Sequence, residues 1–139
     1  MKIEYPACFE PCEEGGFTVT FPDFPEAITE GDTLEEALYM ASDVLDLTLL
    51  SRIADKQEIP IPHEEQDATI HMIAPDAKIQ SALLIRFNRG DRNLLDIARA
   101  VGASGSAVFR LEDPTHWPSL RTLEKTAAAL GKRLVLCLE

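Results

Sequence analysis

The most regular pattern of hydrophobic and polar positions lies between residues 93 and 111. Four apolar residues there keep the i, i+3, i+4, i+7 spacing of one helix face: Leu94, Ile97, Ala98 and Val101. Gly102 then predicts a helix end, because glycine readily adopts the left-handed conformation of that position. Ser104 is typical of the N-cap of a second helix, with Val108 turned inward. Two short helices with a three-residue turn between them predict a helix-turn-helix; the alternative is an ordinary pair of core helices in an all-α bundle.

The first half of the chain alternates between apolar and polar positions. This alternation predicts strands over residues 2–9 and 16–21, joined by a hairpin turn, and a short third strand over residues 27–29. A loop rich in proline and charge is expected over residues 56–67, followed by a strand over residues 68–73.

A helix is predicted before that loop. Thr33 and Glu36 fit a capping box, so the helix begins there and runs to about Ile53. Its last turns are apolar on more than one side, and we expect a later segment or a second subunit to cover them. The order β-β-β-α-β predicts an α+β domain with one small sheet and one helix on it.

The pattern after residue 75 is helical. One helix is expected to end at Gly90, and another to run from Ser119 to Leu130, on either side of the helix-turn-helix. Residues 132–139 are apolar on both faces of a predicted β-strand, so we expect this strand to pair with the same strand of a second copy or with the N-terminal sheet. We therefore divide the chain into an α+β domain, residues 1–75, and a helical domain that ends in a β-strand, residues 76–139.

Charge divides the chain at the same place. Residues 1–75 carry 17 acidic and 3 basic side chains, a net charge of −14, and residues 76–139 carry 7 acidic and 10 basic ones, a net charge of +3. An acidic domain repels nucleic acid and attracts basic surfaces, whereas a mildly basic one can approach a phosphate backbone. The alternative is that the acidity only keeps the protein soluble.

The sequence shows no catalytic pattern. Cys8 and Cys12 lack the second pair of ligands that a zinc site needs, and we expect the three cysteines to be free thiols in a reducing compartment. The histidines are isolated, and no nucleophile or phosphate-binding motif is present. We expect no enzymatic activity, no cofactor and no metal. No apolar run is long enough to span a membrane or act as a secretion signal, so we expect a cytoplasmic protein.

The predicted helix-turn-helix suggests DNA contacts, because the first turn of its second helix meets base edges in the major groove. That turn consists of Ser104, Gly105, Ser106 and Ala107, and Arg110 one turn on is able to bind guanine with two hydrogen bonds. Phosphate contacts are expected from four further basic residues: Arg92, Arg99, Arg121 and Lys125. This set of base-reading residues is small. We therefore expect sequence specificity to need a dimer that reads two half-sites and a contribution from the shape of the DNA.

Both halves resemble one family. The segment EGGFTVTFPDFPEAITEGDTLEEAL is similar to the opening of HicB antitoxins, and IPIP at residues 59–62 is similar to the proline loop that follows in that family. The segment GASGSAVFRLEDPTHWPSLRTLEKTAAALGKRLVLCL resembles the Xre/Cro-type helix-turn-helix of bacterial antitoxins.

This resemblance implies a partial RNase H-like domain, without nuclease activity, that neutralises a small basic HicA-type toxin, an mRNA endoribonuclease. It also implies a C-terminal domain that represses the shared operon by binding operator DNA, and a homodimer or homotetramer. The matching motif implies toxin contacts at six residues: Asp23, Pro25, Glu26, Glu30, Glu35 and Glu36. The segment 22–26 also fits a structural corner of the sheet.

Two further interpretations stay open at this point. One is an RNase H-like nuclease fused to a DNA-binding domain, which would need acids that converge on a metal. The other is a stand-alone transcription regulator whose acidic domain senses a ligand or protein, which would need an enclosed pocket in residues 1–75. The chain also departs from the family, which usually has Ser-Arg where Phe109 and Arg110 stand, so DNA reading is expected to be weaker or differently aimed.

Overall fold

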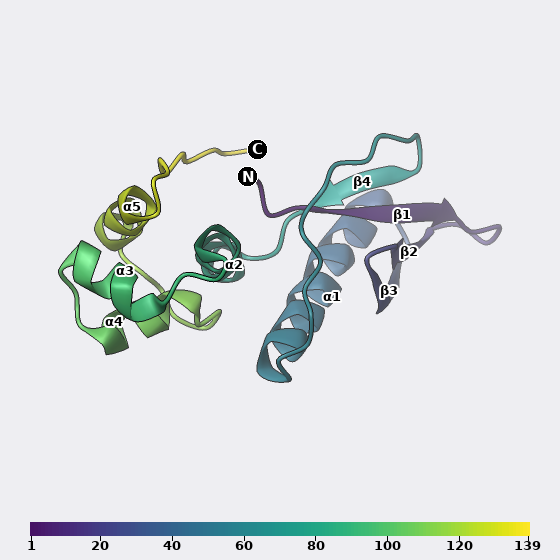
Figure 1. Cartoon of the computed structure of the whole chain (residues 1–139). Helices are drawn as coiled ribbons and strands as arrows, with labels where there is room; N and C mark the ends of the chain where they lie inside the picture. Colours follow the sequence, from purple (N-terminus) through teal and green to yellow (C-terminus); the bar gives the residue numbers. More distant parts are fainter. The chain divides into compact units, whose positions relative to one another are not determined.

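Figure 1 shows the computed structural model, which describes residues 1–104 and 106–139 and gives position 105 only as the first residue of a helix. Contacts within the chain divide it into two compact units, Met1–Asp76 and Ala77–Glu139. This division lies one residue beyond the boundary that the sequence pattern suggests.

The N-terminal unit is an antiparallel sheet with one helix on it (Figure 1). Its elements are β1 (Tyr5–Pro11), β2 (Phe17–Phe21), β3 (Phe24–Gly31), α1 (Leu34–Ala54) and β4 (Ile70–Ile73). The strand order is β3-β2-β1-β4, so the strand that follows the helix returns to pair with β1. The α+β class and the β-β-β-α-β order are confirmed. The third strand is longer than predicted, because the extended backbone that proline favours continues into it at Pro25.

Alternation along the strands builds the core between the sheet and α1. Phe9 lies opposite Val19 in the register of β1 and β2, and both side chains are buried. Helix α1 packs chiefly along β3 and buries Ala41, Leu45 and Leu49. Leu47, on the outer side of the same turns, stays exposed within one copy of the chain. The sheet covers the inner face of this helix end, and cover of the outer face by a second subunit stays a prediction.

The turn between β3 and α1 is unusually close. A Cβ atom added to Gly31 would lie 2.4 Å from the backbone nitrogen of Ala37, so a larger residue would force the strand away from the helix. Thr33 caps the helix, since its hydroxyl accepts a hydrogen bond from the backbone nitrogen of Glu36 at 3.1 Å. These two contacts fix where β3 ends and α1 begins.

The C-terminal unit is helical. It contains α2 (Ala77–Arg89), α3 (Leu94–Val101), α4 (Gly105–Phe109), the 3₁₀ turn η1 (Arg110–Glu112) and α5 (Leu120–Ala129). Gly102 ends α3 with a left-handed φ of 74°, and Ser104 caps α4 as predicted. One apolar core joins these elements. It consists of buried residues from α2, α3, α4 and η1 and of the residue that caps α5: Ile85, Ile97, Ala98, Val108, Leu111 and Leu130.

An ion pair fastens the end of α2 to η1. Arg89 donates from Nε and Nη2 to the carboxylate of Glu112, at 2.5 and 2.9 Å, and from Nη1 to the carbonyl of Arg92 at 2.9 Å. The Arg89 and Glu112 side chains are only 23% and 15% exposed. The hydrogen bond to Glu112 raises the pKa of Arg89, so the pair stays charged and holds α2 beside the segment after α4.

The predicted C-terminal strand is wrong for a single copy of the chain. Residues 132–139 form no helix, strand or turn, and none of the four strands of the N-terminal sheet comes from this segment. A strand needs a hydrogen-bonded neighbour, and the described part of one chain does not give this segment a place in a sheet. Pairing of this segment with the same segment of a second copy stays a prediction.

The Arg89–Glu112 pair gives a stability prediction. Replacing Arg89 by methionine (Arg89→Met) should lower the free energy of unfolding by about 1–3 kcal/mol, because Glu112 is left half-buried without its partner. Trp117 is the single tryptophan of the chain and lies in this unit, so denaturation followed by its fluorescence measures the effect. Arg99→Met is the matched control, since Arg99 and Asp96 are 81% and 70% exposed, and its cost should stay within about 0.5 kcal/mol. Equal losses in the two variants would contradict a special role for Arg89.

Candidate functional site

The acidic residues predicted from the motif fall into two groups at the two ends of β3. Asp23, Pro25 and Glu26 lie where β3 begins, and Glu30 lies where it ends, about 13 Å further along the strand. The exposed Glu35 and Glu36 belong to the first turn of α1, close to Glu30 because the chain passes directly from β3 into this helix. The two groups differ in what their carboxylates already bind.

Glu26 is bound within its own unit. Arg52, near the end of α1, donates from Nε and Nη2 to the Glu26 carboxylate at 2.7 and 2.8 Å. The same guanidinium donates to the carbonyl of Glu58 at 3.0 Å and lies 4.8 Å from the ring centroid of Phe24. The hydrogen bond from Arg52 lowers the pKa of Glu26 below its ordinary value. These contacts tie β3 to α1 and to the loop after it, which is the behaviour of a structural corner.

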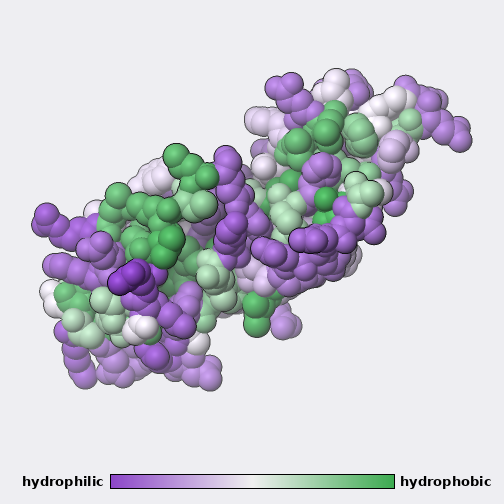
Figure 2. Space-filling model, turned by 90° about the horizontal axis from the view of Figure 1, so that it is seen from above, coloured by the Kyte–Doolittle hydropathy of each residue, from purple (hydrophilic) through white to green (hydrophobic). Residues whose placement is uncertain are grey.

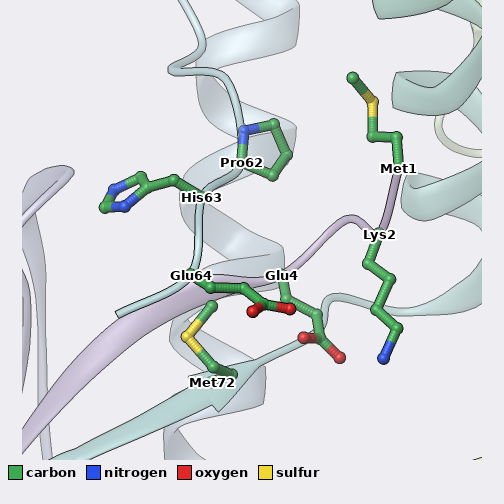
Figure 3. Close-up of a pocket in the computed structure, with 7 residues that line it drawn as sticks. All are labelled: Met1, Lys2, Glu4, Pro62, His63, Glu64 and Met72. Carbon is green, nitrogen blue, oxygen red and sulfur yellow. The ribbon is translucent and has the colours of Figure 1, made fainter. Parts of the chain in front are cut away.

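Asp23 is also occupied. Its Oδ2 lies 2.8 Å from His63 Nε2, in the loop between α1 and β4. Tyr5 holds the same loop, because its hydroxyl donates to the carbonyl of Pro60 at 2.7 Å. In Figure 3 the His63 ring points away from the neighbouring hollow, which measures about 370 Å³ and is faced by the carboxylates of Glu4 and Glu64. His63 therefore fastens a loop, as a structural residue does.

The other end of β3 presents acids that face outward. Glu30 lines a hollow of about 520 Å³ together with Glu13 and Glu14 of the β1–β2 hairpin and Asp32. We call the acidic end the surface formed by the acids of this hollow and of the first turn of α1: Glu13, Glu14, Glu30, Asp32, Glu35 and Glu36. All six residues are exposed, and their carboxylates have no partner among the described residues.

Glu13, Glu14 and Asp32 are site candidates that the sequence did not reveal. Their acidity is visible in the chain, but their meeting with Glu30 depends on the pairing of Phe17 with Gly31 across β2 and β3. The hollow is open to solvent, as is the one beside Glu4, so neither is the enclosed pocket that a ligand sensor would need. Within the described residues no cluster of histidine, cysteine or acidic residues fits a metal ion.

The residues predicted to contact DNA lie on the surface of the C-terminal unit with two exceptions. Ala107 is half-buried, and Gly105 lies outside the described residues. The Ser104 hydroxyl accepts from the backbone nitrogen of Ala107 at 3.2 Å and lies 3.2 Å from the Ser106 hydroxyl, so the cap already uses part of its hydrogen-bonding capacity.

The basic residues predicted to contact DNA are exposed. Arg110 begins η1 immediately after α4. Arg121 and Lys125 lie one turn apart on α5 and therefore share a face. Arg92 is exposed as well, and Arg99 lies 3.5 Å from Asp96 in a pair open to solvent. The unit thus presents cationic side chains around α3, η1 and α5.

The chain thus joins an α+β unit with an open acidic end to a helical unit with exposed cations. Residues 4–78 match the family model described as the HicB_like antitoxin of bacterial toxin-antitoxin systems. The chain belongs to the HicB-like antitoxin family, and the protein is an antitoxin of a toxin–antitoxin system.

Individual relatives agree over nearly the whole chain. Antitoxin HicB 1 of Photorhabdus laumondii subsp. laumondii is 36% identical over 139 residues, which cover 99% of this chain and 88% of that protein. Antitoxin HicB of Escherichia coli K12 is 31% identical, over 96% of this chain and 98% of that protein. A chain of a toxin–antitoxin complex from Streptococcus pneumoniae has a TM-score of 0.47 and 22% identity, over 78% of this chain and 95% of that chain. No helix among the described residues is both long and apolar enough to cross a membrane.

The Glu26–Arg52 pair gives a pH prediction. In the unfolded chain Glu26 loses Arg52 and regains its ordinary pKa of 4.5, whereas the folded pKa is lower. The stability that the pair contributes is therefore present above about pH 4.5 and is lost as the pH falls toward the folded pKa. Because the Glu26 side chain is 48% exposed, the contribution is a few tenths of a kcal/mol.

Urea denaturation of the unsubstituted chain and of Glu26→Gln between pH 7 and pH 4 tests this. The difference between their midpoints should shrink as the pH falls. Glu30→Gln removes a carboxylate from the same strand without breaking an ion pair, and it should cost less at pH 7. A Glu26→Gln difference that stays constant down to pH 4 would contradict the assignment.

Proposed function

We propose that the N-terminal unit binds and neutralises a small basic HicA-type toxin, an mRNA endoribonuclease, and that the C-terminal unit represses the shared operon by binding operator DNA. The observation that carries the first part is the acidic end, with six exposed carboxylates at one end of a unit whose first 75 residues have a net charge of −14. A protein that holds RNA needs a cationic surface, and an acidic surface competes with RNA for it.

The acidic end is suited to this task because its charges remain available. Glu30, Glu35 and Glu36 have no partner among the described residues, whereas Asp23 and Glu26 are bound by His63 and Arg52. We therefore assign toxin contact to Glu30, Glu35 and Glu36, and extend it to the acids of the hairpin. Asp23, Pro25 and Glu26 then act by holding β3 and the loop after α1 in place.

The C-terminal unit fits operator binding as an Xre/Cro-type helix-turn-helix. Ala98 is 3% exposed in the core that α3 and α4 share, and its small side chain suits a close crossing of two helices. Ser104 and Ser106 stand at the start of α4, and Arg110 follows one turn later, in reach of the same groove. Arg92, Arg99, Arg121 and Lys125 would contact phosphates around this helix.

Such a small base-reading set favours a symmetric assembly. One α4 helix of five residues offers few side chains to base edges, so two copies that read two half-sites would supply the missing specificity. We propose a homodimer, or a homotetramer built from two such dimers, as the form that binds DNA.

Charge reversal tests toxin binding. The triple variant Glu30→Lys, Glu35→Lys and Glu36→Lys should bind the small basic protein encoded beside this chain at least about 100-fold more weakly, mainly through slower association. Its matched control reverses three exposed acids of the other unit, Asp91→Lys, Asp96→Lys and Glu124→Lys, and should keep full affinity. Calorimetry measures both. Equal affinity of the two triple variants would contradict the assignment.

Substitution of single cations tests DNA binding. Arg110→Ala should lose about 1–3 kcal/mol on the operator and relax the preference at one base pair in each half-site. Lys125→Ala should weaken binding to all sequences alike and reduce the salt dependence by about one phosphate contact. Fluorescence anisotropy with operator DNA and single-base variants separates these effects. An unchanged affinity and footprint for Arg110→Ala would count against this docking of α4.

A further inference from the structure

Phe109 exposes a large apolar ring at the end of α4. The residue is 55% exposed, and within the described part of the chain no other aromatic ring packs against it. Exposed apolar side chains are common on this chain, and Figure 2 shows hydrophobic surface among hydrophilic surface on both units. Exposure by itself therefore does not distinguish Phe109. Its position on α4 does.

The core of the C-terminal unit fixes which side of α4 faces outward. Val108 and Leu111 are buried in that core, so the side of the helix that carries them is covered. Ser106, Phe109 and Arg110 are exposed. The helical backbone continues through Arg110, whose N–H donates to the carbonyl of Ser106, and residues three and four apart on a helix are neighbours on its surface. The ring of Phe109 therefore shares the outer face with the residues predicted to read bases.

The direction of helical side chains brings the ring closer to the expected groove. Aromatic side chains on an α-helix lean toward its N-terminus and cover the surface over the preceding turn. For Phe109 that turn contains Ser106. The first turn of the second helix is the part of a helix-turn-helix that meets base edges in the major groove.

A phenyl ring in the major groove recognises one chemical group. It has neither a hydrogen-bond donor nor an acceptor, and the apolar group that base pairs present there is the C5 methyl of thymine. We propose that Phe109 packs against a thymine methyl in each operator half-site and makes that position selective for thymine. The inference rests on the operator binding proposed above and assigns a specificity-determining contact within it.

The polar side chains near Phe109 leave it a large share of the readout. The Ser104 hydroxyl accepts from the backbone nitrogen of Ala107 and lies 3.2 Å from the Ser106 hydroxyl, so the two serines already interact with their own helix start. Direct readout then falls chiefly to Arg110 and Phe109. Adjacent Cα atoms are about 3.8 Å apart and base pairs about 3.4 Å apart, so the selected thymine lies within about two base pairs of the guanine bound by Arg110.

Deoxyuridine tests the contact, because it differs from thymidine only in lacking the C5 methyl. Operator DNA is made with this replacement at one position at a time, in both half-sites, and binding is measured by fluorescence anisotropy. Burial of one methyl group contributes about fourfold in affinity, so the unsubstituted chain should bind about 15-fold more weakly when both methyl groups at the sensitive position are missing. That position should lie within about two base pairs of the one at which Arg110→Ala relaxes the preference.

Substitutions at position 109 complete a double-mutant cycle. Phe109→Ala should bind ordinary operator DNA at least about tenfold more weakly, and its affinities for the thymidine and deoxyuridine forms should agree within about twofold. Phe109→Leu keeps an apolar side chain and should retain most of the difference between the two DNAs. Leu120→Ala is the matched control, because Leu120 is 60% exposed in the same unit, and it should retain the whole difference.

The outcomes separate this contact from DNA binding itself. If the unsubstituted chain does not bind operator DNA, both proposals are overturned. If it binds but no position responds to deoxyuridine, or if Phe109→Ala keeps the response, the methyl contact is overturned and DNA binding remains. Loss of the response in Leu120→Ala as well would also contradict the assignment. A response that disappears in Phe109→Ala and persists in Leu120→Ala supports it.

Discussion

The N-terminal unit depends on the close approach of β3 to the first turn of α1. At Gly31 there is no room for a side chain, because a Cβ atom would lie 2.4 Å from the backbone nitrogen of Ala37. The cap at Thr33 then starts the helix within two residues of the strand end. This short passage keeps Glu30, Asp32, Glu35 and Glu36 at one end of the unit, where the β1–β2 hairpin adds two more acids. The acidic end is thus a consequence of a backbone contact.

Acidic residues serve two different purposes in this unit. Glu26 and Asp23 bind Arg52 and His63, and these contacts hold the loop between α1 and β4 against the sheet. The charge of Glu26 is largely neutralised by Arg52, so it adds little to the field around the unit. The acids at the other end of β3 have no such partners among the described residues, and their like charges lie close together on an open surface. That arrangement is unfavourable in isolation, because like charges repel one another.

The C-terminal unit combines a small core with specific polar contacts. Six buried apolar residues hold α2, α3, α4, η1 and the end of α5 together. The Arg89–Glu112 ion pair adds a polar contact between α2 and η1. Helix α4 has only five residues and passes into a 3₁₀ turn at Arg110, so its position depends on its neighbours more than on its own hydrogen bonds. The segment after α5 leaves Val135, Leu136 and Leu138 exposed and adds nothing to this core.

The sequence alone determined the features that depend on neighbouring residues. Helix ends followed from Thr33, Gly102, Ser104 and Ser119, and the half-buried strands from their alternation, because caps and side-chain period act within one or two turns of the chain. Contacts between distant residues were decided only by the tertiary structure. Arg52 neutralises Glu26 from 26 positions away, and the pairing of Phe17 with Gly31 brings the hairpin acids to Glu30. Alternation in residues 132–139 likewise marked a capacity to form a strand, but a strand exists only where a second backbone is available to bond with it.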